Sequence, residues 1–565
     1  MEQMRILSFF FFASLTVSSF FLAGFSNARA SEVIQEYYTD EYLESLKQKK
    51  LTPVLIASGW SESSLGRMEK YKHLHKQTRG FAPSYLFAIK HYLKYGEVKL
   101  AYLSATPISQ AYRRYLFKLS TGINQKSKFS AFEKECYLPF KFLPSKAEIE
   151  AKDTEEDGMD DEADIELEAY QYLKQGENQK TYEDLEALIH GFVDDEAYKV
   201  IGYEAHNTGR FLSLWAEALR VPLLGNNPQA AEWGHKSLCR IAFKEAGVKH
   251  PRGTYGPEKD RLSIANKVYE LLRLKDIKKL IVKLEKSAAG DGNKILDFTE
   301  EFENPEFLSE ENRNEAIVCI LYKMQEWSDS YIQRMRKYGA IVEEFFEGYD
   351  FTSPASMYMI NDEHNVHVLS AYDQSLGGRN NLRFEGGKGP TKIEKDDDLN
   401  LMLLSYKVGE VLAKVGVRGH VGTDFICFKS DKSLKSIDSV YAIENNVRHT
   451  GTMYPFRCAY MLVGEKRLRK KFYQSNDVVK VKKYNKKGER KDFQVAFYDW
   501  IIKQSFSYDR GKRTGIVVHA DYSALGNIAI CAIGDSKEEA SELVKEASAA
   551  ITKWSKEFNA KNSDS

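Results

Sequence analysis

The chain has 565 residues, more than one hydrophobic core normally organises, so several subdomains are expected. Hydrophobic residues make up 43% and charged residues 29%, which is typical of globular proteins. Lys plus Arg and Asp plus Glu both number 81, and this neutral balance argues against a dedicated nucleic-acid binder. The basic run 466–471 is therefore interpreted as a solvated surface.

Residues 1–30 have the features of a signal peptide. A Phe-rich apolar stretch covers 6–25, and Ala28-Arg29-Ala30 then fits a cleavage site. The stretch is also close to the length of a bilayer span, so an uncleaved anchor is the alternative. A start codon farther downstream is a third interpretation, and the localisation stays open between export and the cytoplasm.

The first 220 residues predict an α/β unit. Residues 51–58 and 98–104 are apolar enough to be buried strands, and helical sequence separates them. Residues 148–166 hold eleven acidic side chains, which repel one another and predict an insertion without fixed structure. A strand at 200–206 and a helix at 209–220 complete the unit.

Mixed helices and antiparallel strands are predicted after residue 232. Gly247 is a natural end for the first of these helices, and Ser536 with Glu539 makes a capping box for the last one. The expected elements are helices at 235–247 and 262–274, a hairpin at 280–298, a strand at 341–350, a strand–turn–strand at 357–374, an antiparallel pair at 422–428 and 440–447, and two strands with a helix after 514. The six cysteines form no CxxC pair and are interpreted as small buried thiols.

The hairpin carries the first candidate for chemistry. Lys283 lies on its first strand, and Ser287–Asn293 (SAAGDGN) forms its tip. Small and Gly residues let backbone N–H groups approach phosphate oxygens, and a lysine supplies positive charge. The same sequence is also compatible with an ordinary Gly-containing hairpin that has no role in binding. No Walker motif is present.

The second candidate is a set of polar residues on two neighbouring strands. Glu444 and Asn446 are two residues apart in one strand, so their side chains share a face. Asp424 belongs to the neighbouring strand, and together these oxygens suit Mg²⁺. Arg448 continues the alternation and could bind an oxyanion. A strand with a solvated polar face is the competing interpretation.

A third candidate is the segment 343–350 (EEFFEGYD), whose backbone could meet an adenine edge while a carboxylate accepts ribose hydroxyls. An edge strand with charges explains it equally well. Four histidines follow no HxH or HExxH pattern and receive no catalytic role: His364, His367, His420 and His449.

The order Lys236, Lys283, Glu343, Asp424 and Glu444-x-Asn446-x-Arg448 resembles the ATP-grasp superfamily, and in detail the pheganomycin-type peptide ligases and related carboxylate–amine ligases. The matching stretches cover roughly 220–540: 223–253, 281–293, 353–378, 419–428, 441–456 and 514–540. The resemblance implies an α+β ATP-grasp fold, two subdomains that grip ATP, preceded by an α/β domain. It implies these domains: 31–235, a lid at 236–350, a second subdomain at 351–540 and a tail at 541–565.

The resemblance also implies roles for individual residues. Lys236 and Lys283 would hold the ATP phosphates, with the loop residues Ser287, Gly290, Gly292 and Asn293 closing over them. Glu343 and Asp350 would flank adenine and ribose. Asp424, Glu444 and Asn446 would hold Mg²⁺, with Mn²⁺ as an alternative, and Arg448 would be catalytic. Two stretches depart from the family pattern: Ala288-Ala289 in the loop, and HTGTMYP after Arg448, where Tyr454 replaces a usual His.

The implied activity is ATP-dependent joining of a small or peptide carboxylate to an amine through an acyl phosphate, with release of ADP and phosphate. A kinase with a stable phosphorylated product and an inactive nucleotide-binding module are the alternatives. No nucleic-acid partner is expected, and a membrane partner only if residues 6–25 remain as an anchor. The oligomeric state and the two substrates are not specified by the sequence.

Overall fold

The structure is a computed structural model, and its described residues fall in one compact unit that spans Glu36–Ser565. They comprise 40–58, 80–104, 108–141, 176–205, 210–226, 228–274, 276–287, 292–304, 306–377, 383–391, 400–484 and 487–563. The predicted signal peptide and the acidic run 148–166 lie outside these residues. Within the described part of the chain, no helix combines the length and apolar character that a membrane crossing requires.

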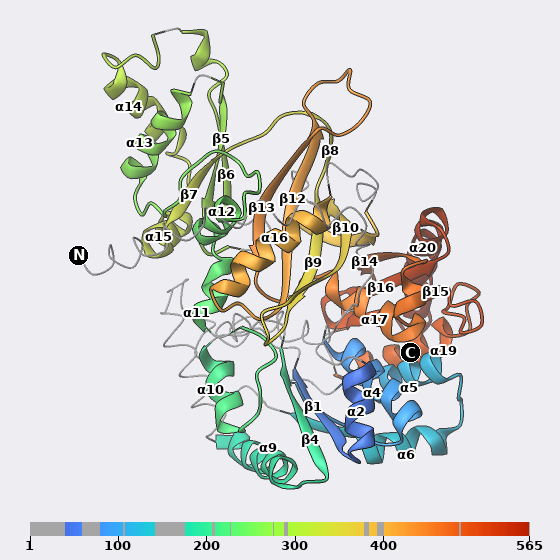
Figure 1. Cartoon of the computed structure of the whole chain (residues 1–565). Helices are drawn as coiled ribbons and strands as arrows, with labels where there is room; N and C mark the ends of the chain where they lie inside the picture. Colours follow the sequence, from blue (N-terminus) through green and yellow to red (C-terminus); the bar gives the residue numbers. More distant parts are fainter. Residues whose placement is uncertain are drawn as a thin grey trace, which may run out of the picture. The chain divides into compact units, whose positions relative to one another are not determined.

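A four-stranded parallel sheet forms the N-terminal part, as the alternation of apolar strands and helices predicts (Figure 1). Its order is β3-β2-β1-β4, with β1 at Thr52–Ser58, β2 at Lys99–Ser104, β3 at Tyr137–Lys141 and β4 at Tyr198–Glu204. Its helices are α2 (Asp40–Gln48), α4 (Phe81–Tyr95), α5 (Gln110–Thr121), α6 (Lys126–Cys136), α9 (Gly176–Asp194) and α10 (Arg210–Ala218). Every residue of β1 is buried, which explains its uninterrupted apolar sequence.

A small antiparallel sheet follows, in the order β6-β5-β7. Its strands are β5 (Lys279–Leu284), β6 (Asn293–Asp297) and β7 (Ala340–Glu344), and the predicted hairpin is confirmed as β5–β6. Helices α13 (Arg261–Leu272), α14 (Arg313–Lys323) and α15 (Asp329–Tyr338) supply apolar residues to the core beneath it. We call this part the lid sheet.

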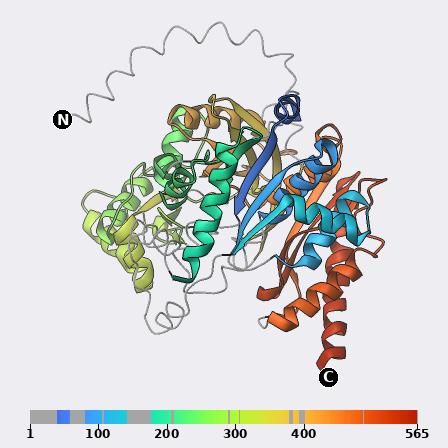
Figure 2. The same ribbon diagram turned by 90° about the horizontal axis from the view of Figure 1, so that it is seen from below.

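A nine-stranded sheet forms the rest of the fold, in the order β13-β12-β9-β10-β11-β14-β16-β15, with β8 paired to β12. The strands are β8 (Tyr349–Thr352), β9 (Pro354–Ile360), β10 (Val366–Gly377), β11 (Arg383–Gly389), β12 (Gly419–Lys429), β13 (Ser439–Asn446), β14 (Phe472–Lys480), β15 (Gly515–Tyr522) and β16 (Asn527–Gly534). Its helices are α11 (Pro228–Ala231), α12 (Lys236–Glu245), α16 (Leu401–Lys414), α17 (Met453–Val463), α18 (Glu465–Leu468), α19 (Lys487–Ile501) and α20 (Lys537–Ser563). Helix α20, the dark-red helix that ends at the C label, packs on β14, β15 and β16 (Figure 2). We call this part the large sheet.

The predicted fold class, α+β with an α/β domain in front, is therefore confirmed in its elements. The predicted single strand at 341–350 is wrong, because β7 ends at Glu344 and β8 begins at Tyr349 in a different sheet. Gly348 lies in the connection, where a Cβ would come within 2.4 Å of the Phe428 ring. The stretch 341–350 thus contributes to two different sheets, although its sequence predicts a single strand.

The capping box at the start of α20 forms as predicted. The backbone N–H of Glu539 donates to the Ser536 hydroxyl at 3.0 Å, and the Glu539 carboxylate accepts from the backbone of Asp535 at 2.6 Å. The Ser536 hydroxyl thus satisfies one N–H group that a helix start leaves without a partner, and the Glu539 carboxylate binds the residue before the N-cap.

Candidate active site

Helix α12 carries two cations on one face, because Lys236 and Arg240 are four residues apart. Lys236 is buried, and its ammonium lies 3.3 Å from the Ser287 carbonyl oxygen and 3.5 Å from Glu444 Oε1. Lys236 therefore lies between the hairpin of the lid sheet and strand β13 of the large sheet. Its helix packs on the large sheet through Cys239, Ala242 and Phe243.

Lys283 and Glu343 form a buried ion pair on the lid sheet. In the register of β5 with β7, Ile281 faces Glu343 and Lys283 faces Ile341, so the charged pair is diagonal on one face. Lys283 Nζ lies 2.5 Å from Glu343 Oε2. The sequence predicted both residues for the site but not their contact.

Arg240 completes this pair, and the sequence analysis missed it. Its Nη1 lies 2.8 Å from Glu343 Oε1, and both side chains are 1% exposed. Burial by itself would raise the pKa of Glu343, but Lys283 and Arg240 outweigh it and hold the pKa below the ordinary value. An arginine four residues after a candidate phosphate lysine is the signal that could have identified it.

Glu285 is a further carboxylate that the sequence analysis did not single out. It accepts hydrogen bonds from the backbone N–H and the hydroxyl of Ser237, in the first turn of α12. Burial raises the pKa of Glu285, and the bonds from Ser237 oppose that shift. The contact fastens the end of β5 to the helix that carries Lys236.

Asp424 and Glu444 face each other across β12 and β13, as their strand register shows. Asn446 Nδ2 donates to Asp424 Oδ2 at 3.1 Å. Burial, and then the charge of Glu444, raise the pKa of Asp424 to about 7. Two carboxylates that repel each other beside an amide oxygen are suited to a bound cation, so this set fits Mg²⁺.

Arg448 follows these residues directly, and its Nη1 lies 3.4 Å from the carbonyl oxygen of His449. Its positive charge opposes the rise in the pKa of Asp424. The predicted catalytic position is thus next to the candidate metal ligands. Its role stays a prediction.

The remaining predicted site residues do not all lie close to Lys236 and Lys283. Asn293 faces Lys283 across β5 and β6, and a Cβ on Gly292 would come within 2.5 Å of Ser287. Gly290 lies outside the described residues. Asp350 is on β8, 67% exposed, with its carboxylate 2.6 Å from Lys429 Nζ. The structure gives no contact between Asp350 and the other described members of the site.

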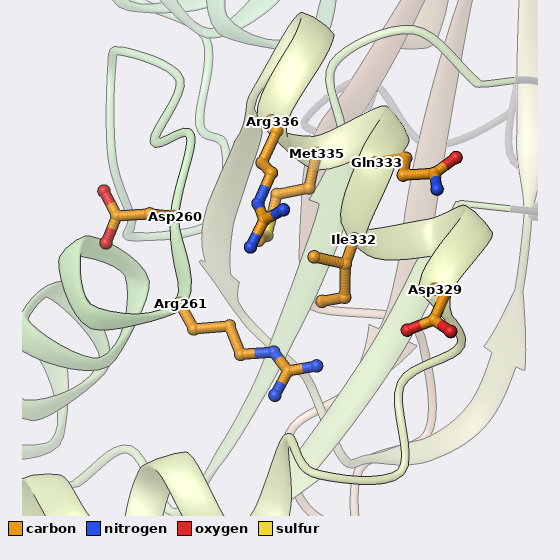
Figure 3. Close-up of a pocket in the computed structure, with 7 residues that line it drawn as sticks. All are labelled: Asp260, Arg261, Asp329, Ile332, Gln333, Met335 and Arg336. Atoms are coloured by element: carbon orange, nitrogen blue, oxygen red, sulfur yellow. The ribbon is translucent and has the colours of Figure 1, made fainter. Parts of the chain in front are cut away.

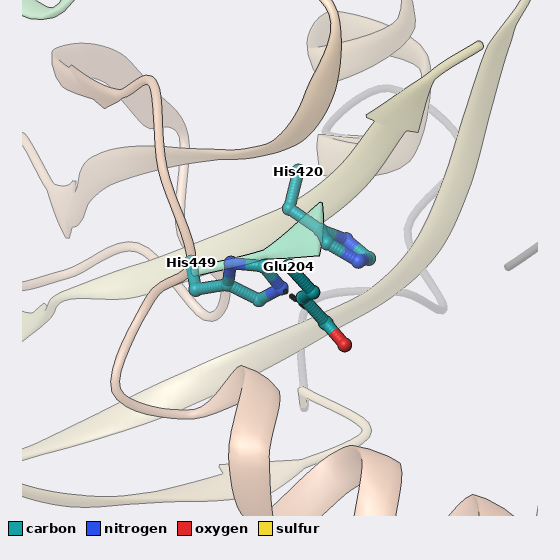
Figure 4. A group of neighbouring side chains, drawn as sticks. All are labelled: Glu204, His420 and His449. Atoms are coloured by element: carbon teal, nitrogen blue, oxygen red, sulfur yellow. Dashed lines mark hydrogen bonds and ion pairs between the residues drawn. The ribbon is translucent and has the colours of Figure 1, made fainter. Parts of the chain in front are cut away.

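Glu204, His420 and His449 form a second polar cluster (Figure 4). Their potential ligand atoms lie within 4.8 Å of one another, and all three residues are buried. His449 Nε2 lies 3.1 Å from Glu204 Oε1, and the same oxygen accepts from Arg457. Burial, then His449 and Arg457, lower the pKa of His420 far below its ordinary value.

The arginine decides how this cluster is interpreted. A metal ion at Glu204 would have to displace or lie against the guanidinium of Arg457, so the geometry favours an ion pair over a metal centre. The pair connects the end of β4 with the segment after Arg448. Sequence analysis assigned His420 and His449 no role, and their burial was not visible from the sequence.

A separate hollow of about 360 Å³ lies in the part of the chain that carries the lid sheet (Figure 3). Its lining residues come from the start of α13 and from the length of α15: Asp260, Arg261, Asp329, Ile332, Gln333, Met335 and Arg336. None of these seven belongs to the predicted site. Asp260 is the N-cap of α13, so its carboxylate is already engaged by Ser263.

Comparisons with known proteins give one family match and several structural likenesses. Residues 504–546 match the model of the PGM1 C-terminal domain, which here comprises β15, β16 and the start of α20. None of the curated proteins matches the sequence. The family match covers a small part of the chain and carries no activity with it.

Solved structures with a likeness to this chain include a biotin carboxylase from Campylobacter jejuni, in complex with a nucleotide named β-γ-ATP. It has 12% identity and a TM-score of 0.46, over 87% of this chain and 89% of that one. A phosphoribosylamine–glycine ligase from Thermotoga maritima has 13% identity and a TM-score of 0.40, over 88% and 96%. The MgADP-bound biotin carboxylase domain of a 2-oxoglutarate carboxylase from Hydrogenobacter thermophilus has 14% and 0.39, over 78% and 76%.

Proposed function

We propose that the chain is an ATP-dependent ligase of the ATP-grasp type that joins a carboxylate to an amine. The observation that carries the proposal is the position of Lys236. Its ammonium lies within reach of both the Ser287 carbonyl oxygen and the Glu444 carboxylate. One cation thereby links the candidate phosphate loop with the candidate metal ligands. That arrangement suits a nucleoside triphosphate held between the lid sheet and the large sheet.

Each group has a defined task in this proposal. Lys236 and Lys283 neutralise charge on the phosphoryl oxygens while the substrate carboxylate attacks the γ-phosphorus, and ADP leaves. Arg448 holds the acyl phosphate, the amine attacks its carbonyl carbon, and phosphate leaves as the amide forms. Asp424, Glu444 and Asn446 would hold Mg²⁺, which supplies charge neutralisation at the phosphates when bound.

The substrate class that we propose, an amino acid or a small peptide, rests on the sequence resemblance to peptide ligases. The departure at Tyr454 lies in the segment that follows Arg448, where the side chain is buried and its ring stacks 5.8 Å from that of His449. Because Tyr454 is buried beside the segment that we propose to be catalytic, its replacement of the usual His should affect the choice of substrate more than the binding of nucleotide. The proposal therefore specifies the reaction and leaves the particular acid and amine to experiment.

The test is to incubate the full chain with ATP, Mg²⁺ and a pool of amino acids and dipeptides, and to quantify ADP, AMP and phosphate. We expect ADP and phosphate that depend on added substrate, with a loss of about 100-fold or more in Lys283→Ala and Glu444→Ala. Lys279→Ala is the matched control, because Lys279 lies on the same strand and pairs with Glu347 and Asp297 instead.

The products distinguish the competing mechanisms. AMP and pyrophosphate would contradict an acyl phosphate and indicate adenylation. A stable phosphorylated product that forms without any amine would indicate a kinase. Equal activity in Lys283→Ala and Lys279→Ala would remove the site proposed above.

A further inference from the structure

Glu343 is a single buried carboxylate that holds two cations, one on each oxygen. Lys283 Nζ lies 2.5 Å from Oε2, and Arg240 Nη1 lies 2.8 Å from Oε1. The Glu343 side chain is 1% exposed. Either cation alone would neutralise the carboxylate, so the second one needs an explanation.

The two cations are held very differently. Arg240 also donates from Nε to the Thr254 carbonyl at 2.6 Å, and its guanidinium lies 5.0 Å from the centroid of the Tyr255 ring. Its side chain is 1% exposed, so burial adds to these contacts in holding its position. Lys283 is slightly exposed, at 9%, and among the described residues its ion-pair partner is Glu343 alone. Lys283 is thus the cation that can turn on its flexible stem.

This difference matters if Lys283 binds a phosphate. A buried carboxylate that loses its counter-charge is strongly destabilising, whereas one that keeps a partner is not. With Lys283 as sole partner, its movement to a nucleotide would leave Glu343 charged and unpaired. Arg240 removes that penalty because it stays on the other oxygen.

We infer that Arg240 is a positioning residue that keeps Glu343 neutralised while Lys283 exchanges this carboxylate for a nucleotide phosphate. The inference rests on the proposed function, because it requires a phosphate near Lys283. It assigns Arg240 no contact with the nucleotide. Lys236, four residues earlier on the same helix, has separate partners in Ser287 and Glu444, so the exchange concerns Lys283 specifically.

A double-mutant cycle on the full chain tests this, with MgADP binding measured by calorimetry. Arg240→Met should weaken binding about tenfold or more, because Lys283 then remains the only counter-charge of Glu343. Glu343→Gln is the reference variant of the cycle, because it removes the charge that both cations neutralise. Arg240→Met combined with Glu343→Gln should bind within about threefold of Glu343→Gln alone.

The double variant separates this role from two others. If Arg240 acted by its own charge on the phosphates, removing Glu343 would not restore binding. If Arg240 only stabilised the fold, Arg240→Met would lose unfolding free energy in the absence of nucleotide and the double variant would recover it, which urea unfolding measures separately. Additive losses would therefore overturn the inference, and so would normal binding by Arg240→Met. Arg240→Lys keeps a charge beside Glu343 but loses the bond to Thr254, so it should weaken binding less than Arg240→Met does, which preserves a test if Arg240→Met fails to fold.

The matched control is Arg252→Met, because Arg252 pairs with Glu344 and Asp276 on the exposed side of the same strand. It should leave MgADP binding unchanged. Absence of MgADP binding by the unaltered chain would overturn both the inference and the proposed function. Binding with the predicted coupling, but without amide formation, would overturn the ligase proposal alone.

Discussion

Three buried or half-buried carboxylates in this protein lie in two kinds of environment. Glu343 has a cation on each oxygen, and its pKa is lowered although burial by itself would raise it. Glu204 is likewise buried, and Arg457 and His449 hold its pKa far below the ordinary value. Asp424 faces another carboxylate, and its pKa is raised instead. The first two arrangements are satisfied within the chain, whereas the third calls for an added cation.

The buried ion pair between Glu204 and Arg457 leads us to predict an effect on stability and on its pH dependence. Glu204→Gln should destabilise the folded state by about 3–5 kcal/mol at pH 7, because Arg457 is then buried without a counter-charge. The folded pKa is lowered, so the stabilisation is present above the ordinary value of 4.5 and is lost as the pH falls through that value toward the lowered pKa. Urea unfolding at several pH values measures the difference.

A control for this experiment is Asp194→Asn, which breaks the exposed ion pair with Arg220 and should change stability little. The gap between Glu204→Gln and the unaltered chain should narrow in acid. A gap of equal size at all pH values would show that packing, not charge, causes it.

At the scale of elements, strand β7 is positioned by a segment that has no strand of its own. Thr254 donates from its backbone to the Val342 carbonyl at 2.9 Å, and Glu344 donates to the Arg252 carbonyl at 2.8 Å. Gly253 sits between these bonds and forms a bridge with Glu343. The segment thus extends the lid sheet by one edge and also supplies the carbonyl that anchors Arg240.

Gly253→Ala should separate this segment from β7, because the added Cβ would lie 2.2 Å from the Val342 carbonyl oxygen. We expect a loss of about 1–3 kcal/mol in unfolding free energy, and weaker MgADP binding because the Thr254 carbonyl that anchors Arg240 moves. Gly256→Ala is the matched control, since a Cβ there meets nothing within 4 Å. If both variants behave alike in calorimetry and in unfolding, the close approach at Gly253 has no consequence.

At the scale of the whole molecule, the candidate site is built from separate sheets. Lys283 and Glu343 belong to the lid sheet, Asp424 and Glu444 to the large sheet, and Lys236 to a helix between them. The end of the N-terminal parallel sheet contributes Glu204, which binds the segment after Arg448. A nucleotide at this place would contact the lid sheet, the large sheet and helix α12 together.

Nucleotide binding should therefore stabilise the whole unit. MgADP at about one hundred times its dissociation constant should add about 2.7 kcal/mol to the unfolding free energy, and thermal unfolding measures it as a higher midpoint. Glu444→Gln should reduce the part of this shift that depends on Mg²⁺, whereas Lys279→Ala should keep the full shift. An unfolding midpoint that MgADP does not move would contradict nucleotide binding at this site.

Much of the fold and the local parts of the site follow from patterns in the sequence. Alternation in β13 placed Glu444 and Asn446 on one face, and the antiparallel pairing with β12 brought Asp424 opposite them, because a strand repeats every two residues. Local sequence likewise predicts the buried strands β1 and β2, from their apolar runs, and the capping box of α20.

Which charged side chains form ion pairs is set by the packing of distant elements. Arg240 and Glu343 are 103 residues apart, and Glu204 and His449 are 245 apart, so no local period relates them. The stretch 341–350 reads as one strand, yet it passes between two sheets because each half finds a different partner strand. Long-range ion pairs and strand partners depend on burial and packing, which a residue's near neighbours in sequence do not encode.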